Sequence, residues 1–126
     1  MSIRQVVVVR RDLNMSPGKT GAQIGHAVQQ FMLDAMHFFV GGFAEIEWNG
    51  DRRAWQDTGE TIIVLGCDDG VALHAVYTEA LAAGLPVFVQ VDEGRTEVEP
   101  NTTTCLAIGP AKRAEIDPIT RHLRLL

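Results

Sequence analysis

Cysteine is scarce in this chain of 126 residues, which has only Cys67 and Cys105. Each lies within or at the end of an apolar run, and neither has a second cysteine or a histidine at the spacing of a metal site. Because free cysteine behaves as a small hydrophobic residue, we expect two buried, reduced thiols in a reducing compartment. The pattern excludes a disulfide framework and a cysteine-based metal centre.

The sequence also lacks a long apolar run. The four consecutive valines near the N-terminus are followed by two arginines, and they are too few for a signal peptide or a membrane span. We therefore expect a cytoplasmic protein without a membrane partner. No repeat, low-complexity tract or linker interrupts the chain, so we expect a single domain over residues 1–126.

An excess of positive charge is missing as well. The chain has 11 lysines and arginines against 16 aspartates and glutamates, a formal net charge of −5. A protein that coats nucleic acid needs many cations to neutralise phosphates, so this balance argues against that class. A content of 46% hydrophobic residues is typical of a globular domain whose core needs no disulfide or metal.

Four short runs have the composition of β-strands: 5–10, 61–66, 86–91 and 103–109. The first two are nearly continuous in β-branched apolar residues, which is typical of strands covered on both faces. We therefore predict an α/β fold with helices on both sides of a sheet.

Two long helices are predicted between these runs. Ser16 and Pro17 form an N-cap and first turn, and the helix that they begin extends to about Phe39. The second helix starts at Asp68 or Asp69, stops at Gly84 and joins two strands in a right-handed parallel crossover.

Two further segments are less regular. Residues 41–59 contain four glycines and both tryptophans, which favours a loop and a short helix that pack the indoles. The C-terminal tail is predicted to be a short helix interrupted or restarted at Asp117 and Pro118.

The first long helix carries a polar stripe at helical spacing, formed by Lys19, Gln23, His26, Gln30, Asp34 and His37. The last three are expected to form a solvated face. Lys19, Gln23 and His26 differ because they lie near the helix N-terminus, where unpaired N–H groups and a partial positive charge favour an anion. For His26 a structural role is the alternative.

The fragment 16–20 suggests a phosphate-binding loop, but that motif requires a glycine where this chain has Leu13. A second informative segment begins with Asp92, at the expected end of the third strand. Asp92 and the loop of Gly94, Arg95 and Thr96 that follows suit the carboxyl edge of an α/β sheet, where functional groups gather. A plain surface turn is the alternative.

Together these segments resemble the second type of peptidyl-tRNA hydrolase. The resemblance is carried by RRDLNMSPGKTGAQIGHA, GLPVFVQVDEGRTEVEP and TTTCLAIGP, in this order, and it extends through the closing HLRLL. It is weakest between Gly41 and Asp57. The chain departs from the usual pattern at Glu93, where a small residue is expected, and at Asn101, where glycine is expected.

The resemblance implies a single mixed four-stranded sheet with helices on both faces and an enzyme that hydrolyses the ester between a peptide and tRNA, without a metal or cofactor. It places Lys19, Gln23, Asp92 and Thr96 in the catalytic site. Arg11, Arg95 and His26 are expected to contact the substrate. The resemblance also implies a homodimer, which is the commonest kind of oligomer.

Other functions stay open at this stage, because a fold does not fix an activity. Glu93, Glu97 and Glu99 surround Arg95 with negative charge, which would repel an approaching phosphate backbone unless arginines elsewhere oppose it. The alternatives are a protein of the same fold that hydrolyses another acyl ester, a module that binds a small ligand or protein, and a purely structural protein.

Overall fold

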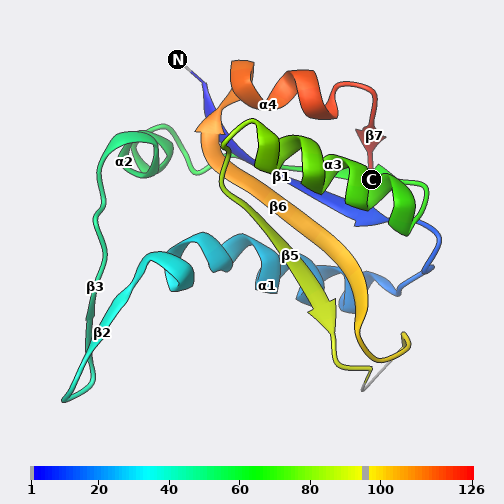
Figure 1. Ribbon diagram of the computed structural model, residues 1–126, viewed down its shortest axis with the longest axis horizontal. Coiled ribbons are helices and arrows are strands. Elements are labelled where there is room, and N and C mark those ends of the chain that lie inside the picture. The colour runs from blue at the N-terminus through cyan, green and yellow to red at the C-terminus, as the bar shows by residue number, and fades with distance from the viewer. Residues whose placement is uncertain (1, 95–96) are drawn as a thin grey trace.

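The computed structural model describes residues 2–94 and 97–126 (Figure 1). Its elements in chain order are β1 (Ile3–Arg10), α1 (Pro17–Ala35), β2 (His37–Phe39), β3 (Phe43–Glu45), α2 (Gly50–Asp57), β4 (Ile62–Cys67), α3 (Gly70–Ala82), β5 (Val87–Asp92), β6 (Thr102–Lys112), α4 (Arg113–Thr120) and β7 (Arg124–Leu125). Within the described part of the chain, no helix is both long and apolar enough to cross a membrane.

The main sheet has five strands in the order β5-β6-β1-β4-β7, and β2 and β3 form a separate hairpin. Strand β1 is parallel to β4 and antiparallel to β6, and β5 is antiparallel to β6. The α/β class and the mixed sheet are confirmed, but the prediction of four strands is wrong. The fifth strand, β7, has two residues, which is too short to produce an alternating pattern.

Strands β4 and β5, joined by α3, run in the same direction, as the crossover prediction required. They are not neighbours, however, because β1 and β6 lie between them. Asp69 caps α3 by accepting a hydrogen bond from the Ala72 N–H at 2.9 Å, and Gly84 has a φ of +72° just after the helix ends. Both ends of this helix therefore lie where they were predicted.

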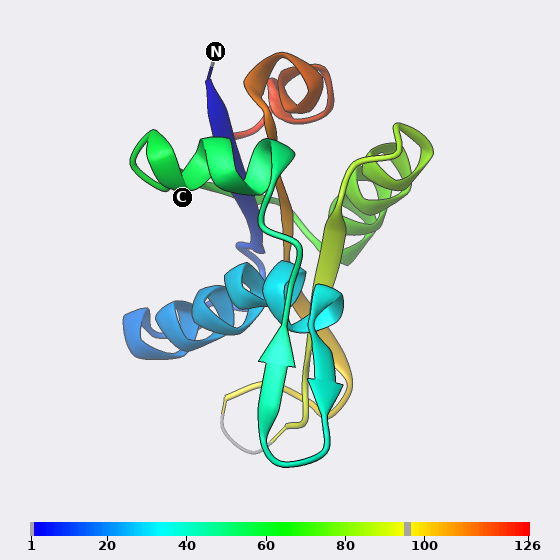
Figure 2. The same ribbon diagram turned by 90° about the vertical axis from the view of Figure 1, so that its left-hand side faces the viewer.

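Helices cover both faces of the main sheet, with α1 on one side and α3 and α4 on the other (Figures 1 and 2). The four consecutive valines of β1 alternate between these faces. Val6 and Val8 pack in the cluster that contains α3 and α4 residues, whereas Val7 and Val9 pack against α1. All four are at most 3% exposed, which confirms a strand buried on both sides.

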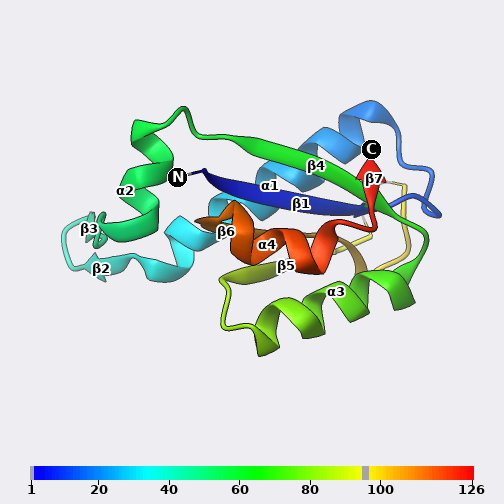
Figure 3. The ribbon, with the colours of Figure 1, turned by 90° about the horizontal axis from the view of Figure 1, so that it is seen from above.

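Helix α1 begins as predicted, because Ser16 accepts a hydrogen bond from the Lys19 N–H at 3.2 Å and Pro17 occupies the first turn. Its predicted end at Phe39 is wrong, since the helix stops at Ala35 and the next residues form β2. Figure 3 shows the β2-β3 hairpin beside α2, at the end of the molecule away from α3. Gly41 and Gly42, both with positive φ, make the turn of this hairpin.

The segment 41–59 contains the predicted short helix, α2, but also the unpredicted strand β3. Trp55 is buried and packs edge-on against Phe31 of α1, with ring centroids 5.5 Å apart, and Trp48 stacks on the same ring at 6.0 Å. Both indoles thus pack together, as expected.

The predicted interruption of the last helix is wrong, because α4 continues through Pro118. Proline removes the N–H that would bond the carbonyl of Ala114. Ala114 and Pro118 are both exposed, so water can satisfy that carbonyl, and the helix tolerates the proline.

Candidate active site

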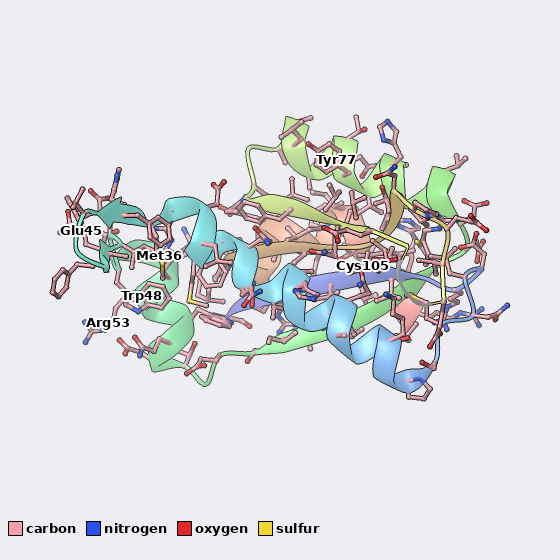
Figure 4. All side chains as sticks on the ribbon, turned by 90° about the horizontal axis from the view of Figure 1, so that it is seen from below. Met36, Glu45, Trp48, Arg53, Tyr77 and Cys105 are labelled. Atoms are coloured by element: carbon pink, nitrogen blue, oxygen red, sulfur yellow. The ribbon has the colours of Figure 1, made fainter. Side chains whose placement is uncertain are left out.

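One cleft lies between α1 and the end of β5. It is lined by Lys19, Gln23 and His26 from α1 and by Asp92 from β5. The cleft has a volume of about 540 Å³ and is lined by Lys19, Ala22, Gln23, His26, Gln90, Val91, Asp92, Glu93 and Glu97. Figure 4 views the molecule from the side of α1, which crosses in front of the sheet. The structure thus brings together four of the seven residues predicted for the site.

Asp92 is the centre of a hydrogen-bonded cluster. Its Oδ1 accepts hydrogen bonds from the Lys19 ammonium and from Gln23 Nε2, the latter at 3.2 Å, and its Oδ2 accepts one from the Gly94 N–H at 2.6 Å. The hydrogen bond from Lys19 is the main reason why the pKa of Asp92 lies below its ordinary value, although desolvation opposes it. Asp92 is therefore ionised at neutral pH, in an ion pair with Lys19.

Gln23 is oriented by a residue that sequence reasoning missed. The fully buried Thr104 donates from its hydroxyl to Gln23 Oε1 at 2.5 Å, which directs the amide nitrogen of Gln23 toward Asp92. Gln23 itself is only 4% exposed. The available signal was a polar residue inside the fourth apolar run, next to Cys105, but such a residue also occurs in ordinary strands.

Cys105 lies beneath the cleft, and its thiol contacts the carbonyl of Gln23 with Sγ and O 3.6 Å apart. Burial raises the pKa of Cys105 to about 11, so the sulfur is a neutral thiol at neutral pH and a poor nucleophile. Both cysteines are buried and free, as predicted.

The N-terminus of α1 already holds an anion, supplied by the chain itself. Glu97 accepts hydrogen bonds from the Ser16 N–H at 2.8 Å and from the Ser16 hydroxyl at 2.5 Å. These bonds lower the pKa of Glu97 below its ordinary value, so the carboxylate is charged. A substrate anion near this helix would therefore meet Lys19 and Glu97 together rather than an empty helix end.

The loop after β5 is tightly closed around Asp92. Gly94 has a φ of +78°, and a β-carbon there would lie 2.5 Å from the backbone nitrogen of Pro100, so glycine is required. Asn101 has a φ of +62°, and its N–H donates to the Asp92 carbonyl at 2.8 Å. Since asparagine tolerates this left-handed conformation, it can replace the glycine usual at this position. Arg95 and Thr96 lie outside the described residues.

Arg11 is not part of this cleft. Its guanidinium donates to the carbonyl of Leu125 at 2.7 Å and lies beside β7, whereas Asp92 is on β5, at the opposite edge of the main sheet. The predicted role of Arg11 would thus require a substrate that extends beyond the Asp92 cleft. Among the residues that the structure describes, no group of three histidine, cysteine, aspartate or glutamate side chains could hold a metal ion.

Comparison with known proteins identifies the family. The family model described as Peptidyl-tRNA hydrolase PTH2 matches residues 3–126. The chain belongs to this family. Two relatives, both called peptidyl-tRNA hydrolase, come from Methanopyrus kandleri and Pyrobaculum aerophilum. They are 40% and 34% identical to the chain, over 98% and 99% of its length and 97% and 98% of their own.

A third relative with the same name, from Halobacterium salinarum, is 39% identical over 98% of this chain and 99% of its own. Membership of the PTH2 family confirms the resemblance stated from the sequence. A solved structure of a protein of unknown function from Agrobacterium tumefaciens C58 is similar in fold, with a TM-score of 0.59 and 15% identity. It covers 100% of this chain and 98% of that one.

Proposed function

We propose that this protein hydrolyses the ester bond between a peptide and tRNA, using only its own side chains. The observation that carries the proposal is the ionised Asp92, held by Lys19, Gln23 and the Gly94 N–H at the wall of an open cleft. The PTH2 family match and the names of its relatives support this assignment of substrate.

Water is the nucleophile that the cleft favours. Among the described residues that line the cleft there is no serine, threonine or cysteine. The nearby Cys105 is a neutral buried thiol. Attack of water on the ester carbonyl creates a tetrahedral oxyanion, whose developing charge the Lys19 ammonium stabilises. Collapse of this intermediate breaks the bond to the ribose oxygen, which takes up one of the two protons of the attacking water and leaves as the hydroxyl of the tRNA.

Asp92 positions the reacting groups and does not act as the general base. A general base works best when its pKa is near the working pH. The hydrogen bonds to Asp92 lower its pKa and so move it further from neutral pH. We therefore assign Asp92 to holding the Lys19 ammonium and the Gln23 amide in place and to accepting a hydrogen bond from the attacking water.

The other residues predicted for the site have supporting roles in this proposal. Gln23 and Thr96 supply neutral hydrogen bonds to the water or to the substrate carbonyl. His26, which lines the cleft, and Arg95 and Arg11 contact the substrate.

A cytoplasmic homodimer of a single domain, residues 1–126, belongs to the same proposal. Support for the dimer comes from Gly21 and Gly25, which are exposed and have open space where a β-carbon would lie, so that a second copy could approach α1 closely. Sedimentation analysis at several concentrations tests the dimer directly, and a monomer at all of them would overturn it.

The hydrolase assignment is tested with an N-blocked aminoacyl-tRNA such as diacetyl-lysyl-tRNA. Lys19→Ala should lower kcat/KM by roughly 10²–10³, the loss typical of removing one oxyanion donor. The matched control is Lys112→Ala, because Lys19 and Lys112 are the only lysines of the chain. Asp92→Asn should lower kcat/KM by about 10², the loss expected when the groups around the reacting atoms are misplaced, with the exposed Asp34→Asn as its control. Absence of hydrolysis by the wild-type protein would refute the proposal.

A further inference from the structure

β5 is an edge strand of the main sheet, paired with β6 on one side only. The carbonyls of Pro86 and Asp92 accept hydrogen bonds from the N–H groups of Gly109 and Asn101, both at 2.8 Å, so these even-numbered positions face β6. The Gln90 carbonyl also faces β6, since it lies 3.4 Å from the Thr104 hydroxyl.

Because successive peptide groups of a strand point in opposite directions, the odd-numbered positions Val87, Val89 and Val91 direct their main-chain N–H and C=O groups away from β6. In the described part of the chain, one hydrogen bond reaches these groups, from Gln90 Nε2 to the Val91 carbonyl at 3.3 Å. The outer side of β5 therefore presents main-chain donors and acceptors at every second residue.

The cleft that contains Asp92 opens onto this same side of β5. Three consecutive residues of the strand line it, Gln90, Val91 and Asp92, although their side chains alternate between the two faces of the sheet. A cleft lined in this way follows the strand's edge rather than one face. Ala22 and His26 of α1 form its other wall, and Val89 and Val91 are 41% and 43% exposed.

We propose that the outer edge of β5 binds the peptide part of the substrate as an added β-strand. This inference rests on the proposed function, since it places the ester at Asp92. Because Asp92 is the C-terminal residue of β5, the peptide runs back past Val91 and Val89 and is parallel to β5. Its main-chain groups then meet those of β5 once every two residues, about 6.6 Å apart.

Pairing through the main chain suits the chemistry of this substrate class. A peptide released during translation can have any sequence, and strand addition supplies affinity through backbone groups that all residues except proline share. The small side chain of Ala22 on the opposite wall leaves room for varied side chains of the peptide.

The first test compares N-acetyl-alanyl-tRNA with substrates that carry two to six alanines before the same ester. kcat/KM should rise by about tenfold in total over the first three or four residues, the gain expected from one or two net hydrogen bonds, and then stay constant. N-methylation of the alternate amides of the tetrapeptide that face β5 should abolish this gain in kcat/KM. N-methylation of the amides that face away from β5 should preserve it.

The second test alters the protein. Val89→Pro removes an N–H that faces away from β6, a change that edge strands tolerate, and it should lower the ratio of kcat/KM for the tetrapeptide substrate to that for N-acetyl-alanyl-tRNA. Val89→Ala keeps the N–H and should keep the ratio. If Val89→Pro does not fold, the N-methylated substrates on the wild-type protein decide the question.

The outcomes separate the two proposals. Hydrolysis of N-acetyl-alanyl-tRNA with no dependence on peptide length, or with equal effects of both methylation registers, would overturn the binding of the peptide along β5 and leave the hydrolase assignment standing. No hydrolysis of any of these substrates would overturn both.

Discussion

At the scale of single residues, the cleft depends on side chains that are held by other side chains. Asp92 accepts hydrogen bonds from three donors, and Gln23 is held in turn by Thr104. The two ends of a glutamine amide have nearly the same shape, so hydrogen bonds alone decide which end faces Asp92. The Thr104 hydroxyl donates a hydrogen bond to the amide oxygen and thereby leaves the amide nitrogen to donate to the Asp92 carboxylate.

We predict that Thr104→Val lowers kcat while changing KM much less. Valine has the same shape but cannot donate to Gln23 Oε1, so the amide can rotate and misplace the groups around Asp92. A small misplacement of this kind costs about 10- to 100-fold in rate. Steady-state kinetics with an N-blocked aminoacyl-tRNA measures the effect, and Thr104→Ser, which keeps the hydroxyl, is the control. A valine variant with wild-type kcat would show that Thr104 does not orient Gln23.

The ion pair of Lys19 and Asp92 predicts how stability depends on pH. The pKa of Asp92 is lower in the folded protein than in the unfolded chain, so the pair stabilises the fold fully above about pH 5, where both states are ionised. This contribution is lost as the pH falls through the folded-state pKa. The difference in Tm between wild type and Asp92→Asn should therefore be constant from pH 8 to about 5 and shrink below about pH 4. A difference that is independent of pH down to 3 would contradict the ion pair.

Single residues differed in how well the sequence alone could predict them. Lys19, Gln23 and Asp92 belong to motifs that carry the family resemblance, and it was this resemblance that implied one shared site for them. The orienting role of Thr104 has no such signal, because it depends on a partner 81 residues away. The place of Arg11 also could not be predicted, because its partner carbonyl belongs to the short strand β7.

At the scale of elements, the end of α1 was the main misjudged boundary. The helical spacing of apolar residues continues to Phe39, but the backbone turns to an extended conformation at Met36, whose ψ is 137°. Phenylalanines at 38, 39 and 43 favour strands, and the glycines at 41 and 42 allow a tight turn. Periodicity shows where a helix is possible, whereas this turn decides where it stops.

The junction between α1 and α2 predicts a large loss of stability on Phe31→Ala. Phe31 is 2% exposed and packs with Ile3 and Trp55, while Trp48 stacks on its ring. Removing the Phe31 ring leaves a cavity, which should reduce the free energy of unfolding by about 3–5 kcal/mol. Urea unfolding followed by tryptophan fluorescence measures the change directly.

The control for Phe31→Ala is Leu33→Ala on the same helix. Leu33 is 42% exposed, and its removal should change the free energy of unfolding by no more than about 0.5 kcal/mol. An equal decrease in the free energy of unfolding of the two variants would mean that the aromatic cluster does not stabilise the packing of α2 on α1.

At the scale of the whole molecule, strand order was the feature that local patterns could not supply. The four longer strands and the α/β class were predictable because each leaves a run of β-branched or apolar residues. Their order depends on contacts such as Val9 with Cys105, which are distant in the chain. The parallel direction of β4 and β5 followed from the helix between them, but their separation by two strands did not.

The charge of the whole molecule predicts a weak dependence of tRNA binding on salt. The net charge is −5, and carboxylates already pair with Arg10, Lys19, Arg53 and Arg113. Because these ion pairs occupy four of the eleven lysines and arginines and the net charge is negative, we expect about two or three phosphate contacts. Raising NaCl from 50 to 200 mM should then raise KM by about 10- to 40-fold, compared with about 10³–10⁵-fold for a protein that makes six to ten contacts.

This dependence is measured as KM for an N-blocked aminoacyl-tRNA over a range of salt concentrations, with kcat as the internal control. The ion pair of Lys19 and Asp92 is 10% and 7% exposed, and such a pair is screened much less than a surface pair, so kcat should change little. A KM that rises as steeply as for a basic RNA-binding protein would contradict this expectation and mean that tRNA contacts more cations, with Arg53 among them if its ion pair with Asp57 opens. Arg53→Ala should then flatten the dependence, whereas with intact pairs it should leave the slope unchanged.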